Sequence, residues 1–206
     1  MARKKYPFEA LKPYLPPGSF DLVMPVILQH KVQLTITPER QSKLGDYRSA
    51  THLKNHRISI NGNLNPYAFL LTLLHEFAHL LAFEKHGYHI QAHGREWKRE
   101  YGAILNTFLQ NSIFPDNIAA EVQLILHNPG ASSCADEGLM RVLKLYDAPT
   151  DGKILVEQLA EGQKFKIANG KYFIRGKKLR KRILCTEYPG NRVYLFSPVY
   201  EVAAVS

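Results

Sequence analysis

The residues with the clearest chemistry are two histidines and a glutamate in one short run, His75-Glu76-Phe77-Ala78-His79. Histidines four residues apart lie on one face of an α-helix, so His75 and His79 can share a metal ion. Glu76 can then act as general base toward a water molecule at that metal. Zinc suits imidazole ligands and lowers the pKa of water toward neutrality. The motif therefore predicts one catalytic Zn²⁺, with Glu76 as the catalytic residue.

A catalytic zinc site needs a third protein ligand, and several later residues could supply it. These candidates are His86, His89, His93, Glu96 and Glu100. The metzincin pattern is excluded, because Ala82 and Lys85 stand where that class has a glycine and its third histidine. We favour His93, because Gly94 lets the chain turn closely beneath the metal and Trp97 wedges two helices together. Glu100, on the following helix, remains the alternative that a gluzincin would use.

The sequence around the motif predicts the helix that carries it. Asn65 and Pro66 are a typical helix start, and Gly87 is a typical stop, so this helix should run from residue 66 to about residue 85. Its apolar flanks predict burial, where two unpaired histidines and a glutamate would be costly without a metal. Further elements are expected as two short helices within 8–30, helices over 94–110 and 118–127, and strands over 32–36 and 58–60.

The sequence pattern changes after a segment rich in Gly, Ser and Pro, which predicts a linker over residues 128–138. Beyond it, apolar and polar residues alternate between turn signals such as Asn169-Gly170. Strands are expected at 140–145, 164–167, 171–174, 182–185 and 192–196. These short strands favour an antiparallel meander, and thus a small all-β domain.

Composition and charge narrow the class of protein. The chain carries a net charge of +9, of which +6 falls from Asp151 onward. No secretory signal is visible, and the longest apolar run, Phe69–Leu74, is far shorter than the roughly 20 residues that cross a bilayer. The two cysteines, Cys134 and Cys185, form no C-x-x-C pair, which excludes a disulfide framework and a cysteine zinc ribbon. We expect a soluble, cytoplasmic protein.

Three groups of residues resemble the SprT-like (Spartan-related) family of zinc metallopeptidases. They are His75-Glu76-x-x-His79, His93-Gly94-x-x-Trp97, and Lys43-Leu44-Gly45-Asp46-Tyr47-Arg48 followed by Ile58-Ser59-Ile60-Asn61. The resemblance covers roughly residues 20–110 and implies that His93 is the third ligand of one Zn²⁺. It also implies a minimal zincin-like metalloprotease domain, which we place over 1–127. Together with the linker and a basic all-β domain over 139–206, this predicts an α+β fold.

Many bacterial members of that family carry a C-terminal four-cysteine zinc ribbon, which this chain lacks. In its place stands a window with six Lys and Arg in eight residues, 175–182, followed by Tyr188, Tyr194 and Phe196. We expect a nucleic-acid surface here, and the resemblance points to DNA. Its candidate residues are Lys177, Lys178, Arg180, Lys181 and Arg182. The alternative is an edge strand charged against aggregation.

Two functions follow as hypotheses. The first is a zinc metalloendopeptidase that hydrolyses protein substrates. This enzyme would associate with DNA, as a protease that acts on DNA–protein crosslinks does. The second is a non-proteolytic, DNA-associated zinc-binding module. The presence of Glu76 favours the first hypothesis, because a metal ion with a purely structural role needs no general base.

Overall fold

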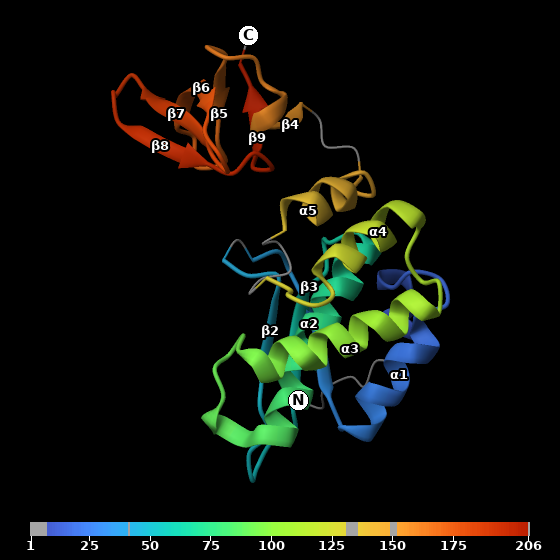
Figure 1. Cartoon of the computed structure of the whole chain (residues 1–206). Helices are drawn as coiled ribbons and strands as arrows, with labels where there is room; N and C mark the ends of the chain where they lie inside the picture. The colour runs from blue at the N-terminus through green and yellow to red at the C-terminus, as the bar shows by residue number, and fades with distance from the viewer. Residues whose placement is uncertain (1–7, 41, 131–135, 149–151, 206) are drawn as a thin grey trace. The chain divides into compact units, whose positions relative to one another are not determined.

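The computed structural model describes residues 8–40, 42–130, 136–148 and 152–205. It divides the chain into two compact units, Met1–Asp147 and Ala148–Ser206 (Figure 1). Each unit has its own apolar core. With helices and two sheets, the protein has the expected α+β architecture.

The first unit combines helices with a small mixed sheet. Its elements are η1 (Phe8–Tyr14), α1 (Phe20–Gln29), β1 (Gln33–Thr37), β2 (Gly45–Arg48), β3 (Arg57–Asn61), α2 (Pro66–His86), η2 (Gly87–His89), α3 (Arg95–Gln110), α4 (Asp116–Ile125) and α5 (Glu137–Lys144). The sheet has the order β1-β3-β2, with β1 parallel and β2 antiparallel to β3. β2 is therefore an edge strand.

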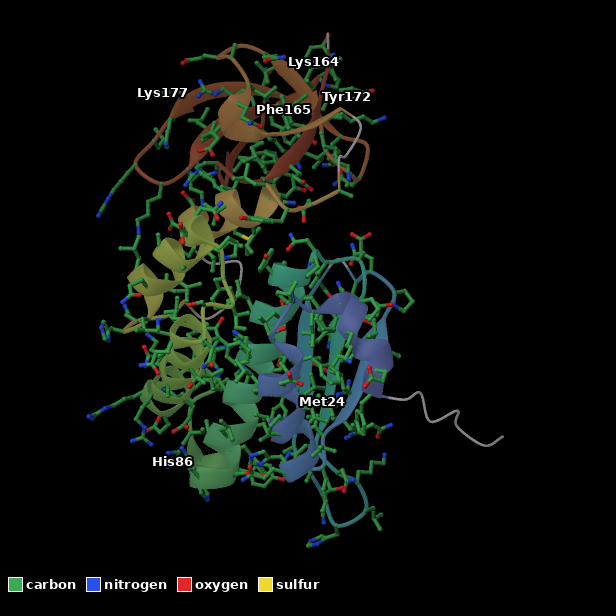
Figure 2. The ribbon with its side chains drawn as sticks, turned by 90° about the vertical axis from the view of Figure 1, so that its right-hand side faces the viewer. Met24, His86, Lys164, Phe165, Tyr172 and Lys177 are labelled. Carbon is green, nitrogen blue, oxygen red and sulfur yellow. The ribbon has the colours of Figure 1, made fainter. Side chains whose placement is uncertain are left out.

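The central element of the first unit is α2, which lies between the sheet and α3 (Figures 1 and 2). Asn65 caps its start, because the Asn65 side chain accepts a hydrogen bond from the Ala68 backbone N–H at 2.9 Å. Gly87 ends it with φ +69°, a left-handed conformation that glycine adopts without a steric cost. The observed bounds agree with the predicted helix.

The core position of α2 also bears on membrane insertion. By length and composition alone, the helical stretch Pro66–His89 could cross a membrane, but 67% of its most apolar window is buried inside the protein. The apolar run Phe69–Leu74 is shorter than this stretch because His75 and Glu76 end the run, whereas the helix continues beyond them. Burial of this kind is what the core helix of a folded domain requires.

The second unit is a six-stranded antiparallel sheet with the order β4-β9-β5-β6-β7-β8. Its elements are β4 (Lys153–Leu155), η3 (Val156–Gln158), β5 (Lys164–Lys166), β6 (Tyr172–Lys178), β7 (Ile183–Tyr188), β8 (Val193–Phe196) and β9 (Glu201–Ala204). Phe165, Phe173, Ile183 and Cys185 form much of its core. Four of the predicted strands are present here as β5, β6, β7 and β8. The other cysteine, Cys134, lies outside the described residues.

The strand expected at 140–145 was wrong, because these residues belong to α5. The Asp136 side chain accepts a hydrogen bond from Leu139 N–H at 2.9 Å and so caps a helix. Leu139 and Leu143, four residues apart, bury one helical face. Consequently the first unit extends to Asp147, whereas the expected linker over 128–138 already contains the start of α5.

Candidate metal centre

Three histidines from two segments converge in the first unit. His75 and His79 lie one turn apart on α2, and His93 directly precedes Gly94, the N-cap of α3. The Nε2 atoms of His75 and His79 are 3.2 Å apart, those of His79 and His93 are 3.1 Å apart, and those of His75 and His93 are 3.2 Å apart. The three residues form a group that could hold a metal ion.

The spacing of these nitrogens fits a tetrahedral cation better than a hydrogen-bonded cluster. Two nitrogens that bind zinc at about 2.0–2.1 Å in tetrahedral geometry are about 3.3 Å apart. A ring nitrogen either donates or accepts, so three mutually adjacent Nε2 atoms always leave at least one like pair. A cation shared by three lone pairs removes that conflict.

The electrostatics keep the three imidazoles neutral, as metal ligands must be. Burial lowers the pKa of His75 to about 3, with further lowering by His79 and His93. Burial, together with His93, lowers the pKa of His79 to about 4. Burial also lowers the pKa of His93. All three lone pairs are thus free at neutral pH.

The Trp97 ring packs against the rings of all three histidines. Its ring centroid lies 4.7 Å from that of His75, 5.4 Å from that of His79 and 4.7 Å from that of His93. Its side chain is fully buried, and its Nε1–H donates to the His75 carbonyl at 3.4 Å. Trp97 therefore joins α3 to α2 at the centre of the site, as the sequence predicted.

Two details depart from expectation. A Cβ on Gly94 would lie 3.1 Å from Gln91 Cβ, so this glycine relieves a turn at residues 91–94 and not a contact with the histidines. Within the described residues, the buried Nδ1 of His75 has no hydrogen-bond partner. In most metal sites this second ring nitrogen donates to a neighbouring oxygen.

Glu76 lies on the side of α2 that faces β2. Its carboxylate packs so closely against Gly45 that a Cβ at that position would collide with Oε1. The Tyr47 backbone N–H donates a hydrogen bond to it. Burial and the nearby Asp46 raise the pKa of Glu76 to about 8, although Arg40 and Lys43 act in the opposite direction. Glu76 is therefore a buried carboxyl beside the histidines and suited to proton transfer.

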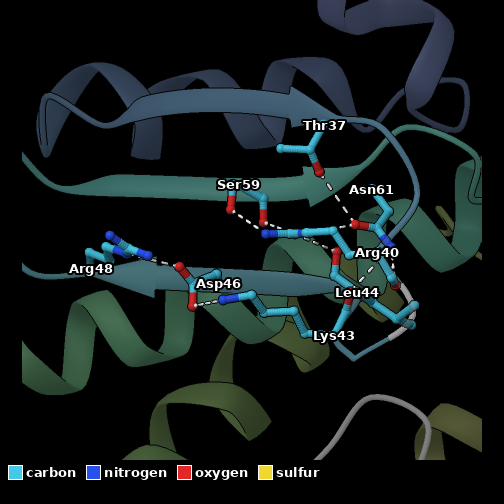
Figure 3. A network of polar contacts seen from close by, with 8 residues as sticks. All are labelled: Thr37, Arg40, Lys43, Leu44, Asp46, Arg48, Ser59 and Asn61. Carbon is cyan, nitrogen blue, oxygen red and sulfur yellow. Dashed lines mark hydrogen bonds and ion pairs between the residues drawn. The ribbon is translucent and has the colours of Figure 1, made fainter.

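Arg40 fixes the segment that leads into β2 (Figure 3). Its guanidinium donates to Asn61 Oδ1 at 2.8 Å, to Ser59 Oγ at 2.9 Å and to the Leu44 carbonyl at 3.3 Å. The Asn61 amide donates in return to the Arg40 and Lys43 carbonyls at 3.0 and 3.1 Å. This network holds Gly45 against Glu76. No local sequence pattern marks Arg40, because Asn61 and Ser59 lie about 20 residues away in the chain.

Tyr47 supports the site from the sheet side. Its ring stacks on His79 with centroids 6.3 Å apart, and its hydroxyl lies 2.9 Å from Nδ1 of His56. Ala50 N–H donates to the same Nδ1, which makes that nitrogen an acceptor, so the Tyr47 hydroxyl donates to it. Nε2 of His56 lies 3.3 Å from the Glu84 carboxylate, which fits a protonated Nε2. Tyr47 thereby holds the His79 ring in place.

The structure does not bring the other candidate ligands to the histidines. Glu100 is buried, and its carboxylate lies 2.6 Å from Lys85 Nζ and 3.5 Å from Arg99 Nε. His86 is exposed and lies 3.1 Å from Arg99. His89 is also exposed, and Glu96 is half-buried outside the group. His93 is thus the one of the five candidates that converges with His75 and His79.

The predicted nucleic-acid residues lie together in the second unit. Lys177 and Lys178 end β6, and Arg180, Lys181 and Arg182 lie in the loop before β7; all five are exposed. The aromatic residues do not accompany this basic loop. Phe196 packs on Phe165 and Phe173 in the core, and Tyr194 packs on Phe173. Tyr188 is exposed but ends β7, at the far end from the loop.

Comparison with known proteins bears on the first unit. Residues 23–117 match the model of the SprT-like family, and this range contains all three histidines and Glu76. The match ends before α5. Neither a search of curated proteins nor a search of solved structures returned a match.

Proposed function

Residues 23–117 form a domain of the SprT-like family, and on that premise we propose that the chain is a zinc metalloendopeptidase that hydrolyses protein substrates. The observation that carries the proposal is the near-equilateral triangle of His75, His79 and His93 nitrogens beside the buried Glu76. His75, His79 and His93 are the proposed ligands of one Zn²⁺, which leaves a fourth position for water or substrate.

The roles of the residues follow from their chemistry. Zn²⁺ held there supplies a Lewis acid that polarises the substrate carbonyl and acidifies the attacking water. Glu76 takes the proton of that water on its carboxylate and passes it to the departing amine nitrogen. Gly45 and the Tyr47 N–H hold the carboxylate in place, and Trp97 keeps the histidine rings together.

The test of this proposal is the substitution Glu76→Gln in the full chain. Both wild type and the variant should bind one Zn²⁺ per chain, because Glu76 is not one of the three residues that could hold the metal. Peptide hydrolysis by the variant should fall about 10²–10⁴-fold, the usual contribution of a general base. Equal hydrolysis by the two proteins would refute the role of Glu76. No hydrolysis by either, with zinc bound, would favour the non-proteolytic module.

A second proposal concerns DNA, which we place on the second unit. The exposed basic loop at 177–182 supports it, as does the +6 charge from Asp151 onward. On another part of the sheet, Lys164 lies 3.8 Å above the Tyr188 ring and 5.1 Å above the Tyr172 ring (Figure 2). Tyr188 is 49% exposed, and basic surfaces with exposed aromatic rings are typical of proteins that bind a nucleic-acid strand.

Charge-matched variants test this second proposal. Changing Lys177, Lys178 and Lys181 to Gln should weaken binding to a DNA oligonucleotide, and the slope of log K against log salt should fall by up to about 0.9 per lost phosphate contact. The control changes Lys12, Lys31 and Lys54 to Gln, with the same loss of charge on exposed residues of the first unit. Equal effects of the two triple variants would show that the basic loop is not a specific surface.

A further inference from the structure

A small cavity lies between three elements of the first unit. Its volume is about 140 Å³. The wall is mainly apolar, with Ala68, Leu71 and Thr72 from α2, Leu44 from the segment before β2, and Met140 and Leu143 from α5. Leu64 and the polar residues Asn65, Lys144 and Asp147 complete the lining. Since one water takes about 30 Å³ of liquid volume, a cavity of this size accommodates four or five carbon atoms.

The cavity lies next to the residues that contact the Glu76 carboxyl. Thr72 precedes Glu76 by one turn of α2, a rise of about 6 Å. Gly45 contacts both residues, since a Cβ there would lie 2.8 Å from Thr72 Cγ2 and would collide with Glu76 Oε1. Leu44, the residue before Gly45, is part of the cavity wall. The cavity is thus adjacent to Glu76 along both α2 and the β2 segment.

The third wall, α5, is fixed firmly on α2. The Asn65 side chain, which caps α2, also donates to the Leu143 carbonyl at 3.0 Å and to Asp147 Oδ1 at 2.6 Å. The Tyr146 ring packs on Tyr67 with centroids 4.8 Å apart. α5 lies outside residues 23–117, the part that matches the family model. This wall is therefore built from residues beyond the shared domain.

We propose that this cavity is a subsite for one apolar substrate side chain of the size of leucine, and that Met140 and Ala68 set its depth. The inference rests on the proposed peptidase function. An extended peptide advances about 3.3 Å per residue, so the side chain belongs to a residue within two positions of the cleaved bond. A missing methylene in such a pocket costs about tenfold or more in kcat/KM.

The first experiment maps cleavage sites in a peptide library with the zinc-loaded full chain. Wild type should prefer Leu, Ile or Met at one position near the cleaved bond. Met140→Ala, which enlarges the cavity, should shift this preference toward Phe and Tyr, and Ala68→Leu, which fills it, toward Ala and Gly. The exposed Leu124→Ala serves as control and should keep the wild-type profile. A preference unchanged in both cavity variants would overturn the subsite.

The second experiment needs no hydrolysis. Methionine-methyl labelling gives signals from Met1, Met24 and Met140, and Met140→Ala identifies the last. In the zinc-loaded Glu76→Gln variant, the peptide Ala-Ala-Leu-Ala-Ala should shift the Met140 methyl signal, and Ala-Ala-Gly-Ala-Ala should not. Met24, on α1, is the internal control. Equal responses to the two peptides, or none at saturation, would refute the subsite.

The two experiments separate the failure of each claim. Absence of hydrolysis together with a leucine-specific Met140 shift would contradict the peptidase function and leave the apolar cavity as a binding site. Hydrolysis without any effect of Met140→Ala or Ala68→Leu would contradict the subsite and leave the peptidase function intact.

Discussion

At the scale of single residues, the site is defined by a conflict that a cation resolves. Three neutral imidazoles present their Nε2 atoms to one another at 3.1–3.2 Å, and no arrangement of protons satisfies all three pairs. Glu76 is also costly, because its carboxyl is buried where its charge is disfavoured. Such costs at one place are typical of a functional site.

The cost of Glu76 should be measurable in the metal-free protein. Its folded pKa is about 8, against an ordinary value of 4.5, so the folded state retains a proton that the unfolded state releases between these pH values. The free energy of unfolding therefore falls as pH rises from 4.5 through 8. Glu76→Gln lacks this loss and should be more stable than wild type at pH 8, by on the order of 4 kcal/mol.

Urea unfolding with a chelator at pH 5 and pH 8 tests this prediction. The difference between variant and wild type should be small at pH 5 and large at pH 8. The histidines titrate in both proteins and so cancel in the comparison. A constant difference across this range would mean that Glu76 is ionised in the folded state throughout.

At the scale of elements, β2 and the segment before it contact the Glu76 carboxyl. The strand is short and lies at the sheet edge, and the Arg40 network holds the segment before it. At Gly45, an added Cβ would have no room beside Glu76 and Thr72 of α2. The glycine is needed here for space, since its φ is not in the left-handed region.

The substitution Gly45→Ala should therefore displace the Glu76 carboxylate. We expect a loss of stability of about 1–3 kcal/mol from overpacking, and a larger proportional loss of peptidase activity than of zinc content. Gly190→Ala is the matched control, because the nearest atom to its Cβ would be 3.7 Å away. Chemical denaturation, metal analysis and peptide hydrolysis measure the three effects. Wild-type activity in Gly45→Ala would contradict this role of β2.

The elements also show what the sequence could predict. The α2 helix was predictable because Asn65, Pro66 and Gly87 mark its ends locally. The convergence of His93 with His75 and His79 was predictable, because Trp97 follows His93 by about one helical turn. The helix α5 was not, since Met140–Leu145 also alternates as a strand does, and the Asp136 cap lay inside the expected linker. The Arg40 network depends on contacts between distant segments, which no local pattern reveals.

At the scale of the whole molecule, the chain consists of two units with separate apolar cores. The proposed metal site and its apolar subsite lie wholly in the first unit, and the basic loop lies in the second. The two proposed functions, hydrolysis and DNA association, therefore belong to units with separate cores. Damage to one core should leave the other function measurable.

The substitution Phe165→Ala tests this separation. Phe165 is fully buried in the second core, and its loss should destabilise that unit by about 3–5 kcal/mol. Trp97 is the single tryptophan and reports on the first unit. Thermal unfolding followed by its fluorescence should be unchanged, while far-UV circular dichroism shows an earlier transition. Leu195→Ala, an exposed change, is the control. An equal shift of the Trp97 transition would contradict two independent cores.

We propose that His75, His79 and His93 hold a catalytic zinc with an open coordination position. Zinc K-edge absorption spectroscopy of the zinc-loaded full chain would measure this coordination. We expect three imidazole nitrogens at about 2.0–2.1 Å and at least one oxygen from solvent. His93→Ala should remove one imidazole, whereas His86→Ala should leave the spectrum unchanged. A fourth protein ligand, a sulfur ligand, or three imidazoles remaining in His93→Ala would refute the proposed zinc site.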